Sequence, residues 1–380
     1  MLKNTRGLLR KLLQLSNVFF AVLLLISAFS WLFPPDTWWF FAAIGLLFPL
    51  LLMIGVALAL VSLLLRHRSG WIVLVAVGLS LPALLRFIPV PSGNNFVATK
   101  SPETIRVLSW NVGLMSFGAR DTVEAIAQNI QILDAIRESE ADVLCLQEFL
   151  TSEIPDGHYN FMDSIKRTMG YPYRYFCIDR SNINGFFTSG TLIMSRYPIT
   201  DTGRTAFAPP FAGSVAQATI DVNGQPVDVF TTRLQSLNFN KNEYAIFDKL
   251  KSADVNALDG SKSLFRKIKF GYQNRKEQID ITYKLIHEPR RPVIFAGDLN
   301  DVPNSYAYYT LKKQFSDVWL QQGSGLGRTF RKIAPTLRID YIFINPWLES
   351  KQIKRIQTTG SDHYGLLADV QIKQKAPYNI

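Results

Sequence analysis

The first 95 residues contain three long stretches without a charged side chain. They run from Leu12 to Pro35, from Thr37 to Leu65 and from Ser69 to Leu85, with lengths of 24, 29 and 17 residues. A helix of about 20 apolar residues crosses the hydrocarbon core of a bilayer. The pattern therefore predicts a membrane anchor over residues 1–95, with three transmembrane helices at about 12–33, 38–65 and 71–89.

An alternative interpretation of the first stretch is a cleaved signal peptide, because basic residues precede it. However, the stretch is long, no clear cleavage site follows it, and two more apolar stretches come after it. Basic residues lie in the N-terminal tail and between the second and third spans, at Arg66 and Arg68. The positive-inside rule then places these segments in the cytoplasm and everything after the third span outside it.

From residue 96 onward, short β-rich segments alternate with Gly, Pro, Asn and Asp. Helical periodicity occurs near 122–139, 243–258 and 272–287. In the first of these segments one face is shared by Val123, Ile126, Ile130, Leu133 and Ile136. The predicted strands are 105–110, 142–147, 173–178, 190–195, 215–221, 227–232, 293–297, 339–344 and 366–372. Because strands outnumber helices and several follow one another at hairpin distance, we expect an α+β domain with largely antiparallel sheets.

The charge of the chain is divided unevenly. The whole sequence has 41 basic and 30 acidic residues, of which residues 1–95 hold seven and one. The remaining 285 residues therefore hold 34 basic and 29 acidic residues, so the net charge of +11 splits into +6 and +5. The excess of basic residues in 1–95 is interpreted as a signal of membrane topology. The near balance of the second part is unlike the strong basic field of a tight DNA-binding domain.

The two cysteines, Cys145 and Cys177, both fall in predicted strands. An extracytoplasmic location would permit a disulfide bond, but the sequence does not show that the two side chains meet. Two buried free thiols are the favoured interpretation. Zinc is disfavoured, because neither cysteine belongs to a ligand pair and the sequence has no His-x-x-x-His.

Polar side chains stand where predicted strands begin or end. The set consists of Asn111, Glu148, Asp298, Asn300, Asp340, Asp362 and His363. Residues of this kind at strand termini are expected to converge on one rim of a sheet. An oxygen-rich set with one imidazole suits a hard cation such as Mg²⁺, with Mn²⁺ as the alternative. Such a set can neutralise a phosphodiester, activate water and assist the leaving oxygen.

The string WN…LQE…SRYPI…GDLND…RIDYI…SDH resembles the endonuclease/exonuclease/phosphatase superfamily, which includes deoxyribonuclease I, apurinic/apyrimidinic endonucleases, neutral sphingomyelinases and inositol-polyphosphate 5-phosphatases. The match covers about 104–374, and GDLND with a C-terminal SDH is its specific part. The resemblance implies a catalytic domain over 96–380. It also implies a four-layer α/β/β/α sandwich of two mostly antiparallel sheets, with the site at one end.

The resemblance also implies roles for individual residues. Glu148 resembles the principal metal ligand, with Asn111 beside it. Asp298 resembles the residue that orients or deprotonates the attacking water, and Asn300 the residue that binds the phosphate and fixes Asp298. The remaining roles belong to His363, which resembles the catalytic histidine, to Asp340, which would hold its other ring nitrogen, and to Asp362, which would add a metal contact.

The chain departs from the family pattern after the strand VDVFTT, where relatives usually carry histidine. Here Arg233 takes that place in Thr-Arg-Leu. Arginine can bind a phosphate through two parallel hydrogen bonds, but it does not donate a proton near neutral pH. Two hypotheses follow: an active hydrolase with altered substrate preference, or a weakened or non-catalytic homologue. Asn182 lies where relatives place a substrate loop and is a second candidate for substrate binding.

The resulting prediction is an integral membrane protein with an extracytoplasmic, metal-dependent phosphoester hydrolase domain. Phosphodiester hydrolysis by metal-assisted attack of water is favoured, with nucleic acid or nucleotide as the default substrate. A lipid-headgroup phosphodiesterase of the sphingomyelinase type is the alternative, because the spans would hold the site beside the bilayer. Phosphoester and bilayer are the expected partners, and the sequence implies no protein partner.

Overall fold

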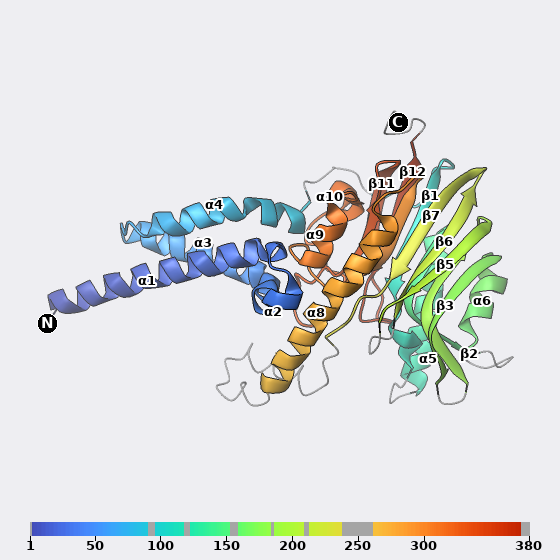
Figure 1. The fold of residues 1–380 in the computed structure, drawn as a ribbon, viewed down its shortest axis with the longest axis horizontal. Helices are drawn as coiled ribbons and strands as arrows, with labels where there is room; N and C mark the ends of the chain where they lie inside the picture. The colour runs from blue at the N-terminus through green and yellow to red at the C-terminus, as the bar shows by residue number, and fades with distance from the viewer. Residues whose placement is uncertain are drawn as a thin grey trace. The chain divides into compact units, whose positions relative to one another are not determined.

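The computed structural model describes residues 2–89, 96–117, 122–152, 159–183, 186–208, 213–237 and 261–373. These residues form two compact units (Figure 1). One unit contains the N-terminal apolar helices with residues 261–276 and 302–309. The other contains the remaining described residues from 96 onward. The helix predicted at 243–258 lies outside the described residues.

The N-terminal helices are α1 (Leu2–Ala28), α2 (Pro35–Ile44), α3 (Phe48–Leu64) and α4 (Gly70–Phe87). Three segments are long and apolar enough to cross a membrane, namely Gly7–Ala28, Pro35–Leu64 and Gly70–Phe87. The second segment differs from the single predicted span, because a 3₁₀ turn at Gly45–Leu47 divides it. Pro49 therefore stands in the first turn of α3, where its missing N–H costs nothing.

Polar side chains join the helices of this unit. Asn17 of α1 is fully buried, and its Nδ2 donates hydrogen bonds of 2.7 Å to the hydroxyls of Ser62 and Ser69. Small and hydroxyl-bearing residues of this kind pack and link helices in apolar surroundings. The segment 302–309 belongs to the same unit. Asn304 accepts a hydrogen bond from Ser30 Oγ at its backbone oxygen, 2.7 Å away.

The second unit is built on two six-stranded sheets. The first has the order β11-β12-β1-β2-β4-β3, and the second β5-β6-β7-β8-β10-β9. The strands of the first are β1 (Thr104–Asn111), β2 (Val143–Ser152), β3 (Tyr173–Ile183), β4 (Phe187–Ser195), β11 (Leu348–Ile356) and β12 (Gly365–Ile372). Those of the second are β5 (Ile199–Ala206), β6 (Ser214–Val222), β7 (Gln225–Thr232), β8 (Val293–Asp298), β9 (Ser316–Asp317) and β10 (Asp340–Ile344).

The predicted α+β sandwich of two mostly antiparallel sheets is confirmed. The helices of this part of the chain are α5 (Thr122–Ser139), α6 (Phe161–Met169), α8 (Ser261–Ile286), α9 (Tyr306–Lys312) and α10 (Val318–Gln322). All nine predicted strands are present. The three that the sequence did not predict, β5, β9 and β11, each lie at the edge of a sheet. β5 and β11 carry polar residues on exposed edges, so they lack the apolar runs that signal a strand. β9 has only two residues, which is too short for a pattern.

Each sheet contains one parallel pair of strands. β1 pairs with β2 in parallel, and β7 pairs with β8 in parallel, while the other pairings are antiparallel. Parallel neighbours end at the same edge of a sheet. Asn111 ends β1, Asp298 ends β8 and Arg233 directly follows β7. Glu148 lies within β2, directly after Gln147, the last β2 residue that pairs with β1. The two parallel pairs, β1–β2 and β7–β8, therefore contribute two predicted site residues each.

A hydrophobic core fills the space between the sheets, and a second one lies where α5 and α6 pack on the first sheet. Cys145 and Cys177 lie in the first core as buried free thiols, as predicted. Helix α5 forms as its periodicity predicts, and Leu133 and Ile136 of the predicted face pack in the core. The predicted face is wrong for the first half of the helix, where Val123, Ile126 and Ile130 are exposed.

Candidate active site

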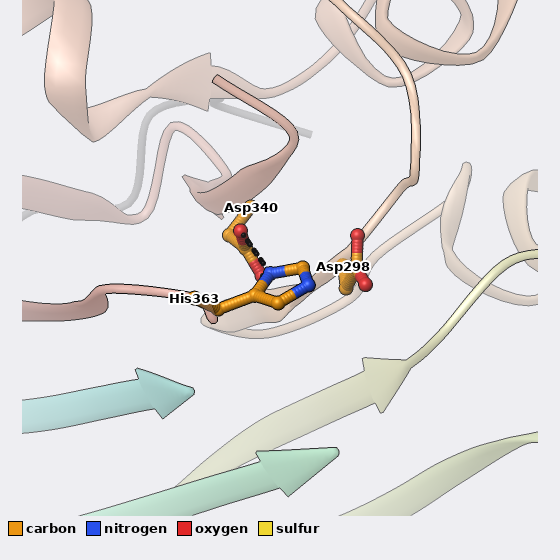
Figure 2. Close-up of side chains that lie close together, drawn as sticks. All are labelled: Asp298, Asp340 and His363. Carbon is orange, nitrogen blue, oxygen red and sulfur yellow. Dashed lines mark hydrogen bonds and ion pairs between the residues drawn. The ribbon is translucent and has the colours of Figure 1, made fainter. Parts of the chain in front are cut away.

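Two carboxyl groups flank one imidazole at the ends of β8 and β10. Asp298 ends β8, Asp340 begins β10, and the two residues are directly paired across the antiparallel ladder. His363 Nδ1 lies 2.9 Å from Asp340 Oδ2 and 3.2 Å from Oδ1. Figure 2 shows the imidazole between the two carboxyl groups, with its second ring nitrogen on the side of Asp298. All three side chains are buried.

This arrangement changes the acidity of two groups. Burial raises the pKa of the Asp298 carboxyl to about 7, and the neighbouring Asp340 carboxylate adds to the rise. Burial alone would lower the pKa of His363, but the charge and hydrogen bond of Asp340 raise it to about 10. At neutral pH the histidine is therefore an imidazolium, while Asp298 exchanges its proton near neutrality.

The motif after β8 fixes the Asp298 carboxyl group. The backbone N–H of Asn300 donates to Asp298 Oδ1 at 2.8 Å, and Asn300 Nδ2 donates to Oδ2 at 3.0 Å. Asn300 adopts a positive φ of 50°, a conformation that asparagine tolerates better than most residues. A Cβ on Gly297 would overlap the backbone oxygen of Thr232 in β7. The glycine of GDLND thus permits close packing of β7 and β8.

Glu148 and Asn111 come from the parallel pair of the first sheet. The pairing of β2 with β4 is irregular between Leu146 and Phe149, and Glu148 has a φ of +49° at this bulge. Bulges redirect a side chain out of the strand's alternation. Asn111 Nδ2 donates to Glu148 Oε1 at 3.1 Å and to Asp298 Oδ2 at 3.0 Å. One amide thus joins the acidic residues of the two sheets.

Arg233 follows β7 and lies against the same acids. Its Nε is 2.5 Å from Glu148 Oε1 and 4.0 Å from Asp298 Oδ2. The cluster therefore contains three carboxylates, one imidazole, two amides and one guanidinium, contributed by both sheets. Acids, a cation and a protonated imidazole around one point can bind a phosphoester and activate water beside it.

A family model decides the identity of the fold. The model described as the endonuclease/exonuclease/phosphatase family matches residues 108–363. The chain belongs to the endonuclease/exonuclease/phosphatase family. Members of this family cleave phosphoester bonds, so the protein is a phosphoester hydrolase by family. A second model, a domain of unknown function, matches residues 10–87, and a search of curated proteins gave no significant match.

Solved structures share the endonuclease/exonuclease/phosphatase fold with this chain. A family protein from Beutenbergia cavernae is 21% identical with a TM-score of 0.52, over 71% of this chain and 72% of that one. The human Nocturnin catalytic domain with bound sulfate anion is 17% identical with a TM-score of 0.51, over 73% and 97%. A family protein from Bacteroides vulgatus is 17% identical with a TM-score of 0.51, over 72% of this chain and 100% of that one. At these identities the likeness concerns the fold alone.

One predicted member of this endonuclease/exonuclease/phosphatase site does not join the cluster described above. The Asp362 carboxylate forms an ion pair with Lys332 at 2.8 Å instead of joining the acids. Although burial works against it, His363 and Lys332 lower the pKa of Asp362. Asn182 lies in β3, and its side chain is outside the described part of the structure.

The sequence did not predict the two residues that hold the backbone of Asn111 and His363 in place. Ser361 Oγ donates to the Asn111 backbone oxygen at 2.7 Å and accepts from the His363 N–H at 3.0 Å. Trp110 Nε1 donates to the His363 backbone oxygen at 3.0 Å. Both residues adjoin predicted site residues in WN and SDH, which was the available signal. Their hydrogen bonds tie the end of β1 to the segment before β12.

Proposed function

We propose that this protein is a membrane-anchored, divalent-metal-dependent phosphodiesterase. The observation that carries the proposal is the buried Asp340–His363–Asp298 arrangement in a member of a phosphoester hydrolase family. Hydrolysis of a phosphodiester requires neutralised phosphate oxygens, an activated water and a protonated leaving group. The cluster supplies a group for each requirement.

The donor set fits a hard divalent cation. Ligand atoms of Asp298, Asp340 and His363 lie within 4.8 Å of one another, but the Asp340 oxygens already face the His363 Nδ1. Glu148 is partly exposed and shares the Asn111 amide with Asp298, so Glu148 and Asn111 would hold the ion. A bound Mg²⁺ would neutralise charge on the phosphate oxygens. Asp362, which now pairs with Lys332, would add a further contact to the ion from beside the cluster.

The roles of the chain's own residues follow from acidity and contacts. Asp298, with a pKa of about 7, accepts the proton of the attacking water above neutral pH. Asn300 holds Asp298 in orientation and offers its amide to the phosphate. His363, kept protonated by Asp340, places positive charge and a proton beside the leaving oxygen. Arg233 binds the phosphate, and Asn182, near the end of β3, is a second residue for substrate binding.

The three apolar segments are the support for membrane anchoring. The basic residues in the first part of α1 and between α3 and α4 favour a cytoplasmic location for these ends. The phosphodiesterase would then face away from the cytoplasm. Nucleic acid or nucleotide is one substrate class, and a lipid headgroup is the other, which the anchoring beside a bilayer favours.

The test is hydrolysis of bis-p-nitrophenyl phosphate by the full chain in detergent micelles, with Mg²⁺, Mn²⁺ or a chelator. We expect turnover with either metal, none with chelator, and a loss of at least about 100-fold in His363→Asn. Asp134→Asn, on the exposed face of α5, is the matched control. The absence of turnover in the wild-type protein with both metals would show a non-catalytic homologue. Plasmid DNA and sphingolipid vesicles as substrates then separate the two classes.

A further inference from the structure

The backbone at Arg233 is held rigidly beside Asp298. The two residues form an isolated parallel bridge, and the Leu234 N–H donates to the Asp298 backbone oxygen at 2.9 Å. Asn300 Nδ2 donates to the Leu234 backbone oxygen at 2.9 Å. On the other side, Thr232 Oγ1 donates to the Ser214 backbone oxygen at 2.9 Å. The side chain of Arg233 therefore starts from a fixed point at the cluster.

The guanidinium end lies on the proposed metal ligand. Arg233 Nε is 2.5 Å from Glu148 Oε1. This Nε atom is buried, yet it has no hydrogen bond of proper geometry among the described residues. The contact is therefore an attraction between charges and not a directed hydrogen bond. A guanidinium usually binds a carboxylate through two parallel N–H donors, so this contact leaves the arginine free to accept a better anion.

A divalent cation and Arg233 require the same oxygen. A cation bound by Glu148 needs direct contact with the carboxylate, and the guanidinium occupies the space within 2.5 Å of Oε1. Two cations at such a distance also repel each other, most strongly where water is excluded. We infer that Arg233 competes with the divalent cation for Glu148. When an oxyanion draws the guanidinium away, Arg233 releases Glu148 to the cation. This inference rests on the proposed metal-dependent function.

The competition couples the two ligands. The tetrahedral oxyanion of a phosphoester offers Arg233 a bidentate partner. Once the guanidinium turns to the oxyanion, Glu148 is free to hold the cation. Coupling between two ligands is reciprocal, so an oxyanion must tighten cation binding by the same factor by which the cation tightens oxyanion binding. The family histidine, which is shorter and neutral above its pKa, would not produce this coupling.

The experiment measures the dissociation constant of Mn²⁺ for the full chain in micelles at pH 8, from the electron paramagnetic resonance signal of free Mn²⁺. Arg233→Gln is expected to bind Mn²⁺ about tenfold more tightly than the wild type. Sulfate at constant ionic strength, set with chloride, is expected to tighten binding in the wild type by about threefold or more and to leave Arg233→Gln unchanged.

Arg291→Gln is the matched control. Arg291 Nε pairs with Asp228 Oδ2 at 2.7 Å, so the variant removes the same charge from a similar ion pair. Arg291 precedes β8, whereas Asp298 ends it, a separation of roughly 20 Å at about 3.3 Å per residue. This exceeds the screening length of about 8 Å at physiological salt. Its Mn²⁺ affinity is expected to stay within about twofold of the wild type.

Equal Mn²⁺ affinity in the wild type and Arg233→Gln, with Glu148→Gln losing the ion, would overturn the competition alone. Absence of Mn²⁺ binding from every variant, together with metal-independent hydrolysis, would overturn the proposed function as well. Arg233→His is the second variant if glutamine prevents folding, and it is expected to bind Mn²⁺ more tightly for the same reason. The sulfate effect on the wild-type protein needs no variant, and its absence would contradict the coupling.

Discussion

The charge on Asp340 determines the state of His363. Both carboxylate oxygens lie within 3.2 Å of Nδ1. An amide in place of this carboxylate keeps its shape but removes the charge that keeps the imidazole protonated. We predict that Asp340→Asn lowers kcat for bis-p-nitrophenyl phosphate at least about 100-fold, with KM changed less than about threefold. Steady-state kinetics at saturating Mg²⁺ provide the measurement.

Asp201→Asn, an exposed carboxylate of β5, is the control for Asp340→Asn, and its kcat is expected to match that of the wild type. Retention of more than about one fifth of the turnover in Asp340→Asn would contradict the role given to His363. Circular dichroism spectra of the variants exclude unfolding as the cause of a loss.

The acidity of Asp298 predicts how the rate depends on pH. Its pKa of about 7 lies above the ordinary value of 3.8, so the carboxylate is lost as pH falls through 7 instead of through 4. The rate should therefore fall about tenfold per pH unit below 7 and level off above it. His363, with a pKa of about 10, should cause a second fall at higher pH. A flat profile of kcat/KM between pH 5 and 8 would contradict this assignment.

The sequence predicted some contacts of the cluster and not others. The contacts of Asn300 with Asp298 and of Asp340 with His363 were both expected from the family resemblance. The contact of Arg233 with Glu148 requires that the end of β7 in one sheet lies beside the bulge of β2 in the other sheet. Apolar and polar patterning gives the strands, but it does not give which strand ends face each other.

At the scale of elements, the parallel pair β7–β8 holds the cluster, and Gly297 permits its close spacing. A methyl group there would overlap the Thr232 backbone oxygen, and a backbone atom cannot move aside as a side chain can. We predict that Gly297→Ala lowers the melting temperature by about 4 °C or more and kcat at least about tenfold. Differential scanning fluorimetry and steady-state kinetics test the two effects.

Gly203→Ala in β5 is the matched control for Gly297→Ala. Its new Cβ would lie 3.2 Å from Gln217 Oε1, the end of a flexible side chain. Its melting temperature should remain within about 2 °C of the wild type. If the melting temperature of Gly297→Ala is as close to that of the wild type as expected for Gly203→Ala, strand β8 tolerates a side chain at position 297.

Edge elements show why the sequence did not predict all of the fold. The interior strand VIFAG of β8 is apolar throughout and was predicted. By contrast, β11 (Leu348–Ile356) carries Lys351, Lys354 and Arg355 because one of its edges faces solvent. Its polar sequence is indistinguishable from a loop until its partner β12 is known.

At the scale of the whole molecule, the distribution of basic residues predicts the orientation in the membrane. Native thiols are buried, so single introduced cysteines report exposure to a membrane-impermeant maleimide. We predict that Lys166→Cys, on α6, reacts in intact cells, whereas Leu65→Cys, at the end of α3, reacts only after permeabilisation. Both positions are exposed. The reverse labelling pattern would place the catalytic unit in the cytoplasm.

The segment 302–309 begins just after Asn300 and Asp301, yet it packs in the unit of the apolar helices. Asn304 Nδ2 donates to the Ser27 backbone oxygen, and Trp31 stacks on Tyr309 with ring centroids 3.6 Å apart. A shortened chain starting at residue 96 would keep every acid of the site but remove the partners of a buried asparagine and a tyrosine. Unpaired buried amides are costly. Expression of this hydrolase therefore calls for the N-terminal helices as well, since a cut after the last apolar helix divides a folded unit.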